Sequence, residues 1–288
     1  MTDEIPKKAG PQHPPHLLDP SLYSMRPEDD DETLKQHILG VQTKAYQVAP
    51  YGSIYLFTFT RCRLSWQVPY QQILRLGRER KNPIFLDVDT DVRFTVGNGI
   101  WEAVDVGFPA EWAVGTDLHS ELWDLGHELF KSSPETFPAK FVNGNYLDPE
   151  VLAVVPPASR KTAKAPDLSN LTSLNSLHGS VSVIHVLAFF HLFNEAEQLY
   201  IARAFAGLLS AEPGSLIVGS NIGARVKGPV KQEFSGVEVN MFAHNPESWV
   251  ALWDGEVFEK GTVKVEAELR DGGAGSYREL MFWSVTRL

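Results

Sequence analysis

Apolar and polar positions along the chain form blocks, and the spacing inside each block predicts a strand or a helix. Short, continuous apolar runs predict buried strands, and they lie in residues 84–88, 112–114, 141–142, 181–190 and 215–219. Apolar residues spaced three and four apart predict amphipathic helices, and they lie in residues 33–45, 70–76, 100–106, 118–130 and 195–209. Strands and helices that alternate in this way predict an α/β fold with a mostly parallel sheet.

The C-terminal end follows a different pattern. Residues 263–269 alternate strictly between apolar and polar, residues 280–285 are strand-like, and Asp271-Gly272-Gly273 separates them as a turn,. Two strands joined in this way pair antiparallel, so we expect a C-terminal hairpin that closes one edge of the sheet. Ligands of open α/β folds bind at the carboxyl ends of the parallel strands, and we expect the functional site there.

The pattern also predicts the domain organisation. Residues 1–31 are rich in proline and end in an acidic run, which is typical of a mobile tail. Residues 32–288 are expected to form one domain, in which residues 32–81 make a helical and aromatic lid. Pro, Ser, Ala and Lys dominate residues 149–179, so we expect a surface excursion there.

Composition narrows the class of ligand. The chain has 288 residues, of which 43% are hydrophobic and 22% charged, and its formal net charge is −10; binding of nucleic-acid phosphates needs concentrated Lys and Arg, which this chain lacks. The lone Cys62 excludes an internal disulfide and a multi-cysteine metal site, and we expect no metal,. The N-terminus has no apolar signal region, and no stretch approaches the roughly 20 apolar residues that span a bilayer. We therefore expect a cytoplasmic protein without a membrane partner, and the sequence leaves a homodimer open.

Residues 82–118 are the centre of the pattern, because they predict a strand, a loop, a helix and a second strand that ends in Asp117. In such a unit the loop and the acid usually hold the phosphate or sugar of a nucleotide-like cofactor. Here Asp89 stands where a cofactor loop places glycine, and Gly97 and Gly99 come later. We expect one of these two glycines to take a positive φ in a rebuilt turn.

Several short motifs occur in order along residues 33–288: Lys44-Ala45-Tyr46, Pro50-Tyr51, Phe85-Leu86-Asp87-Val88, Gly115-Thr116-Asp117-Leu118, Ile184-His185, His191-Leu192-Phe193, Pro213-Gly214-Ser215-Leu216 and His244-Asn245-Pro246-Glu247-Ser248. Together they resemble the class I S-adenosylmethionine-dependent methyltransferases, and within them a group from fungal secondary-metabolite clusters, including meroterpenoid pathways. The resemblance implies a Rossmann-like methyltransferase fold. It also implies cofactor contacts at Asp87, Gly97, Asp117 and Asn145.

The chain departs from that family at two cofactor positions. The family follows its first strand with a glycine-rich loop, and here the loop is longer and begins with Asp89, whose Cβ stands where the cofactor should pass the backbone,. The family commonly has an aspartate at the position of Asn145, where it accepts a hydrogen bond from the adenine amino group; an amide can still accept that bond. Asp117, the match to the acid that binds the ribose hydroxyls, is kept.

Candidate catalytic residues follow the fourth strand and precede the last helix. His191 is either a general base at the mouth of the site or a core histidine, whereas His185, inside an apolar run, is expected to be structural. His244 and Asn245 could face a substrate, although Asn-Pro is also an ordinary helix start. Aromatic residues either pack on the core or form the wall of a substrate pocket, and the pocket candidates are Tyr51, Tyr55, Phe57, Trp66 and Phe193.

Two kinds of enzyme and one binding protein fit these observations. Because the departures fall on cofactor positions while the strands are intact, the sequence favours a cofactor-independent cyclase or isomerase, including pericyclases of the Diels-Alderase type, that folds a polycyclic terpenoid or polyketide precursor. The first alternative is an S-adenosylmethionine-dependent O-methyltransferase of such a metabolite. The second alternative is a non-catalytic relative that binds a partner.

Overall fold

The computed structural model describes residues 30–49, 52–55, 57–60, 63–88, 98–160, 165–234, 237–271 and 279–288. The predicted tail up to residue 29 lies outside the described residues, and so do Tyr51, Asp89 and Gly97. The first described helix begins at Asp31, which the sequence assigned to the tail.

A seven-stranded sheet is the core of the molecule, with the strand order β3-β2-β1-β4-β5-β9-β8. Neighbours among the first five strands pair parallel, whereas β9 pairs antiparallel with both β5 and β8. The α/β fold with its antiparallel C-terminal edge is therefore confirmed, and this is the Rossmann-like methyltransferase arrangement. The strands are β1 (Ile84–Val88), β2 (Ala113–Asp117), β3 (Lys140–Asn143), β4 (Val181–Leu187), β5 (Leu216–Ile222), β8 (Val263–Asp271) and β9 (Glu279–Arg287).

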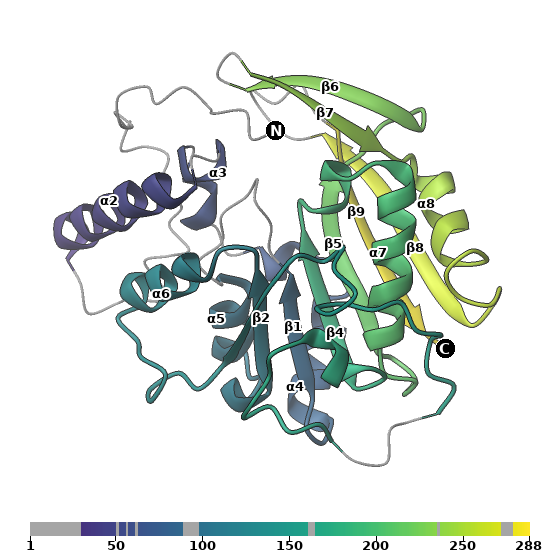
Figure 1. Ribbon diagram of the computed structural model, residues 1–288, viewed down its shortest axis with the longest axis horizontal. Coiled ribbons are helices and arrows are strands. Elements are labelled where there is room, and N and C mark those ends of the chain that lie inside the picture. The colour runs from purple at the N-terminus through teal and green to yellow at the C-terminus, as the bar shows by residue number, and fades with distance from the viewer. Residues whose placement is uncertain are drawn as a thin grey trace.

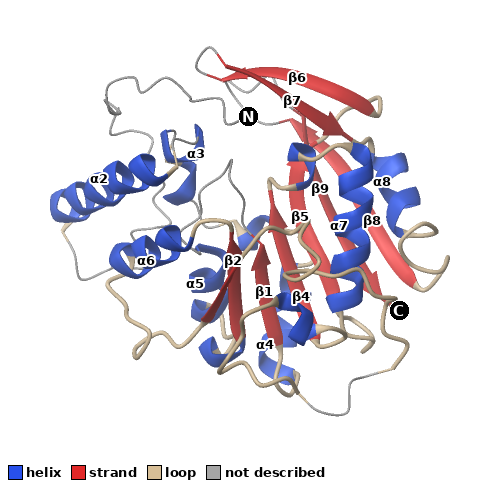
Figure 2. Ribbon diagram, viewed as in Figure 1, coloured by secondary structure: helices blue, strands red, loops and turns tan. Residues whose placement is uncertain are grey.

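Helices cover both faces of this sheet (Figures 1 and 2). Side chains of a strand alternate between its faces, and β1 shows this directly, because Ile84 and Leu86 belong to one buried cluster and Phe85 to another. The cluster of Ile84 includes residues of α7 (Glu195–Leu208) and α8 (Pro246–Trp253). The cluster of Phe85 includes residues of α4 (Tyr70–Glu79) and α5 (Asn98–Asp105).

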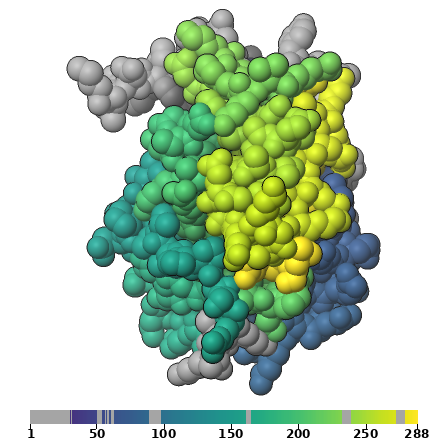
Figure 3. All heavy atoms as spheres, turned by 90° about the vertical axis from the view of Figure 1, so that its right-hand side faces the viewer, coloured from purple at the N-terminus to yellow at the C-terminus, as the bar shows by residue number. Residues whose placement is uncertain are grey.

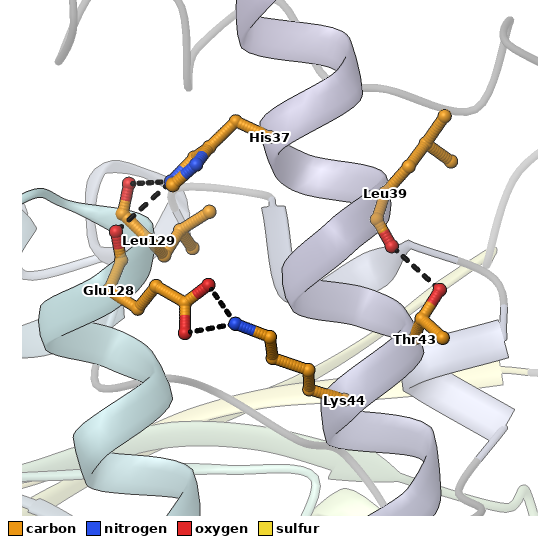
Figure 4. Close-up of polar contacts among 6 residues, drawn as sticks. All are labelled: His37, Leu39, Thr43, Lys44, Glu128 and Leu129. Carbon is orange, nitrogen blue, oxygen red and sulfur yellow. Dashed lines mark hydrogen bonds and ion pairs between the residues drawn. The ribbon is translucent and has the colours of Figure 1, made fainter.

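The N-terminal helix α2 (Asp31–Val48) packs against α6 (Ser120–Leu129). Figure 4 shows the polar contacts between them: Lys44 Nζ donates to both carboxylate oxygens of Glu128 at 2.6 and 2.8 Å, and His37 Nε2 donates to the carbonyls of Glu128 and Leu129. His37 thus bonds the last carbonyls of α6, which have no partner inside that helix. The aromatic segment that follows α2 is neither one helix nor one strand, and its described parts are the short turns α3 (Gly52–Tyr55), η2 (Thr58–Thr60) and η3 (Leu64–Trp66).

A two-stranded ribbon that the sequence did not reveal follows β5. It consists of β6 (Gly228–Phe234) and β7 (Val237–Ala243), which pair antiparallel as a separate sheet. Figure 1 shows the ribbon across the end of the molecule at which the parallel strands finish, and Figure 3 shows it above the surface formed by α8 and the C-terminal strands. The ribbon and the N-terminal helices therefore flank the carboxyl ends of the sheet.

The predicted surface excursion at residues 149–179 contributes to the core. Leu152, Leu168, Leu174 and Leu177 belong to the main buried cluster, and the described part of this segment has one short helix, η5 (Leu174–Leu177). Burial of these leucines anchors the segment on the sheet. Within the described residues, no helix has the length and apolarity that crossing a membrane requires.

Candidate functional site

The carboxyl ends of β1, β2, β3 and β4 meet at one edge of the sheet, facing the N-terminal helices and the β6–β7 ribbon (Figure 1). In a parallel sheet the residues at these ends come from distant parts of the sequence but lie close in space. The predicted cofactor residues Asp87 and Asp117 both lie here, near or at the ends of neighbouring strands. The structure therefore brings these two acids to the same edge.

Asp87 is buried and paired with a histidine from the next strand. The register of the sheet sets Asp87 beside His185, and His185 Nδ1 lies 2.7 Å from Asp87 Oδ1. The pair lies on the face covered by α5, since the ring of His185 is 6.0 Å from that of Phe85. Among the described residues, neither Asp87 Oδ2 nor His185 Nε2 has a hydrogen-bond partner. His185, which the sequence assigns a structural role, thus contacts a predicted cofactor residue.

The first turn of α5 lies against this carboxylate. A Cβ on Gly99 would lie 2.4 Å from Asp87 Oδ2, which is closer than real Cβ contacts allow, so only glycine fits there,. Gly99 is helical and has no positive φ, and Gly97, the other candidate for the left-handed turn, lies outside the described residues, so that expectation stays a prediction. Asn98 precedes it, is buried, and has no partner for either side-chain atom within the described chain.

The end of β2 is built by hydrogen bonds around Asp117. This side chain is buried, and its Oδ1 accepts a bond of 2.7 Å from the backbone N–H of His119. The amide of Asn143 on β3 donates to the carbonyl of Leu118 at 2.7 Å and ties the two strand ends together. Asn145 is exposed, and its Oδ1 already accepts from the N–H of Leu147 at 3.0 Å, so an adenine amino group would have to share that oxygen,.

His191 lies in the turn η6 (Phe190–Leu192) just after β4. It is buried, and the N–H of Ile222 donates to its Nδ1 at 3.4 Å. Ala188, between β4 and this turn, has a φ of 51°, an unfavourable conformation for a residue with a Cβ,. Its N–H donates to Ser220 O at 2.6 Å, and this bond helps to hold the bend that places His191 over the sheet edge.

His244 directly follows β7, and its backbone bonds the chain that leaves β5. The N–H of Ala224 donates to its carbonyl at 3.0 Å, so His191 and His244 both bond the chain as it leaves β5. Its ring Nδ1 lies 2.9 Å from Ser248 Oγ, while its Nε2 has no partner among the residues that the structure describes. Burial away from water, with Lys227 nearby, lowers the pKa of His244 from 6.5 to about 4, and Glu195 offsets part of this effect,.

Asn245 caps the helix that follows. Its Oδ1 accepts from the N–H of Ser248 at 3.0 Å, and its own N–H donates to Ser248 Oγ at 3.1 Å. This reciprocal arrangement, with Pro246 at the start of α8, is a helix-start motif,. The geometry of Asn245 is thus accounted for by the helix, and its catalytic role stays a prediction.

The aromatic pocket candidates do not share one environment. Phe57 is buried with α2 and α6, whereas Tyr55 and Trp66 are 43% and 46% exposed. Phe193 packs on the main core, with its ring 4.9 Å from that of Phe189. A pocket wall formed by these residues stays a prediction.

One groove and no metal cluster stand out in the described part of the chain. The groove has a volume of about 410 Å³, lies between α2 and α6, and is lined by none of the predicted site residues. Within the described ranges no group of three or more His, Cys, Asp or Glu side chains could hold a metal ion. Sequence reasoning gave no site role to Asn98, which is buried at the start of α5, or to His185, which bonds Asp87.

The family model and the relatives that this chain resembles in sequence are named methyltransferases. The family model of the meroterpenoid methyltransferase N-terminal domain matches residues 29–60, which include α2 and α3. O-methyltransferase phiE from Fungal sp. (strain ATCC 74256) is 31% identical over 253 residues, covering 88% of this chain and 73% of that protein. Asnovolin E/Chermesin D methyltransferase nvfJ from Aspergillus novofumigatus is 26% identical over 260 residues, covering 88% and 82%. Among solved structures, the PH0226 protein from Pyrococcus horikoshii OT3 matches with a TM-score of 0.47 and 12% identity, covering 85% of this chain and 99% of that one.

Proposed function

Since the chain belongs to the family of fungal secondary-metabolite methyltransferases, we propose that it transfers a methyl group from S-adenosylmethionine to an oxygen atom of a terpenoid or polyketide metabolite. The observation that carries this proposal is the pair of buried aspartates, Asp87 and Asp117, near or at the ends of adjacent parallel strands. Buried carboxylates need donors or cations to face them.

The described residues fit this cofactor. Asp87 Oδ2 and both amide atoms of Asn98 are buried polar atoms with no partner in the described ranges, and they lie at the first turn of α5. Asp87 and Asn98 would hold the amino-acid part of the cofactor, and Asp117 would accept hydrogen bonds from its ribose hydroxyls. When bound, the cofactor supplies a methyl group that is electrophilic because it is attached to a sulfonium.

The methyl acceptor lies where β4 and β5 end. The ring of His191 bonds Ile222 and the backbone carbonyl of His244 bonds Ala224, so both residues lie beside the chain where it leaves β5. His244 Nδ1 donates to Ser248 Oγ, and its Nε2 therefore has a lone pair that accepts the acceptor hydroxyl proton in a hydrogen bond,. His191 is the second group that orients or deprotonates this hydroxyl.

Cyclisation without a cofactor, the hypothesis that the sequence favoured, has less support. Its main argument was the altered loop at Asp89, which lies outside the described residues. The relatives of the chain are named methyltransferases, and this supports the alternative and the use of S-adenosylmethionine.

Calorimetric titration with S-adenosylhomocysteine tests the proposal. We expect saturable binding to the folded wild-type protein and binding at least about tenfold weaker for Asp117→Ala, because a charged hydrogen bond to a ribose hydroxyl is lost. Glu256→Gln, which removes an exposed acid far along the chain, is the matched control and should bind like wild type. Transfer of labelled methyl groups to terpenoid and polyketide alcohols then identifies the acceptor class. A folded protein that does not bind the cofactor product, but cyclises a precursor, would refute the methyltransferase assignment.

A further inference from the structure

We propose that His185 is a positioning residue that holds the Asp87 carboxylate in the orientation required to bind the ammonium of S-adenosylmethionine. This inference rests on the proposed function and extends it to a residue that does not touch the cofactor. The two residues are adjacent in the parallel sheet, on β1 and β4. Their side chains are 3% and 0% exposed, so no water competes for the bond between them.

The hydrogen bond from His185 holds one oxygen of the Asp87 carboxylate and does not involve the other. His185 Nδ1 donates to Asp87 Oδ1 at 2.7 Å, a short bond for an imidazole and a carboxylate,. A single imidazole N–H satisfies only one of the two carboxylate oxygens, and Asp87 Oδ2 has no partner in the described chain. Burying such an oxygen without a donor destabilises the folded protein. The site is therefore complete only when a donor or a cation faces Oδ2.

The residues around Asp87 Oδ2 indicate where a donor or cation that binds this oxygen would lie. Gly99 lies close to this oxygen, because a Cβ there would lie 2.4 Å from Oδ2. Asn98, the preceding residue, is also buried and has an unpartnered side-chain oxygen within the described ranges. An ammonium has several N–H donors, so one that faces Asp87 Oδ2 has donors left for a second acceptor, and Asn98 Oδ1 at the start of α5 is the candidate,.

A positioning role differs from a purely structural one in its effect on binding. If His185 only filled the core, its replacement would lower stability and leave the affinity of the folded protein for the cofactor unchanged. If it orients Asp87, loss of the Nδ1–H bond lets the carboxylate rotate, and the affinity falls even in protein that remains folded. An asparagine at this position places an N–H close to where Nδ1 stands and should restore the bond.

The experiment compares wild-type protein with His185→Leu, His185→Asn and Val183→Ala. Val183 is a buried residue on the same strand and face, so Val183→Ala controls for lost stability. For each of the four proteins, calorimetry gives the affinity for S-adenosylhomocysteine and thermal unfolding gives the stability. We expect about tenfold weaker binding for His185→Leu, binding within about threefold of wild type for His185→Asn, and unchanged binding for the destabilised Val183→Ala.

Each outcome decides between the hypotheses. Unchanged affinity of His185→Leu, or equal loss in all three variants, overturns the positioning role alone. No binding by folded wild-type protein overturns the proposed function and this inference with it. Should His185→Leu not fold, wild-type protein with ¹⁵N-labelled histidine is titrated with S-adenosylhomocysteine; the Nδ1–H resonance of His185 should shift on saturation, and an unmoved resonance overturns the inference.

Discussion

At the scale of single residues, Gly99 is the position where packing and ligand binding coincide. A methyl group on Gly99 would collide with the Asp87 carboxylate, so we expect Gly99→Ala to destabilise the fold by about 1–3 kcal/mol,. It should also weaken binding of S-adenosylhomocysteine, because the carboxylate must move. Urea unfolding and calorimetry measure the two effects. Gly40→Ala is the control: Gly40 is an exposed helical glycine with nothing within 4 Å of its Cβ, and this change should stabilise the protein by about 0.5–1 kcal/mol,.

His244 should make stability depend on pH. Its pKa is about 4 in the folded protein and near 6.5 when unfolded, so between these values the unfolded chain binds more protons. Stability from this residue is present above pH 6.5 and is lost as the pH falls toward 4, and about 2 kcal/mol of it is lost between pH 7 and pH 5. His244→Asn keeps a donor to Ser248 Oγ and does not titrate, so urea unfolding at pH 7 and pH 5 should give a smaller difference for this variant. An equal difference in both proteins would contradict the assignment.

His191 tests whether the buried imidazole takes part in the reaction. If it orients or deprotonates the acceptor hydroxyl, His191→Ala should lower kcat by about 10- to 1000-fold while the unfolding midpoint changes little. Steady-state rates with the identified acceptor and thermal unfolding give both quantities. Full activity with a lowered midpoint would make His191 a core histidine that bonds Ile222.

At the scale of elements, the packing of α2 against α6 depends more on the apolar face of α2 than on the ion pair between Lys44 and Glu128. Ile38 is fully buried between α2 and α6, so Ile38→Ala should cost about 2–4 kcal/mol and expose α2 to hydrogen exchange,. Lys44→Met removes a pair whose side chains are 56% and 39% exposed, and it should cost no more than about 1 kcal/mol,. Hydrogen exchange of residues 31–48 distinguishes the two variants. Equal exposure of α2 in both would show that the ion pair dominates.

Most elements could be predicted from the sequence because their apolar periodicity is strong. The five parallel strands and helices α5, α6 and α7 appear where the pattern placed them, within a few residues. The β6–β7 ribbon was missed because its strands mix polar and apolar residues and have no long continuous apolar run in the sequence. The burial of four leucines in the segment at 149–179 could not be predicted, because they are scattered among prolines and polar residues.

At the scale of the whole molecule, ligand binding should appear as increased stability. A ligand that binds only the folded state at a concentration of 100 Kd adds about 2.7 kcal/mol to the free energy of unfolding. For a chain of this size we expect S-adenosylhomocysteine to raise Tm by about 5 °C. Differential scanning calorimetry measures the shift, which should be much smaller for Asp117→Ala. An identical shift in both proteins would place the ligand away from β2.

The sequence by itself determined the fold class, the order of the strands along the chain and the acids that end them, because burial imposes a period on strands and helices that survives without tertiary information. It also showed that Asp117 belongs to the sheet edge. Only the tertiary structure decided which residues face Asp87. His185 lies 98 positions away in the chain, and the pairing of β1 with β4 makes them neighbours. A hydrogen bond across strands leaves no periodic signal in the sequence, so the contact that positions the carboxylate became visible only in the folded chain.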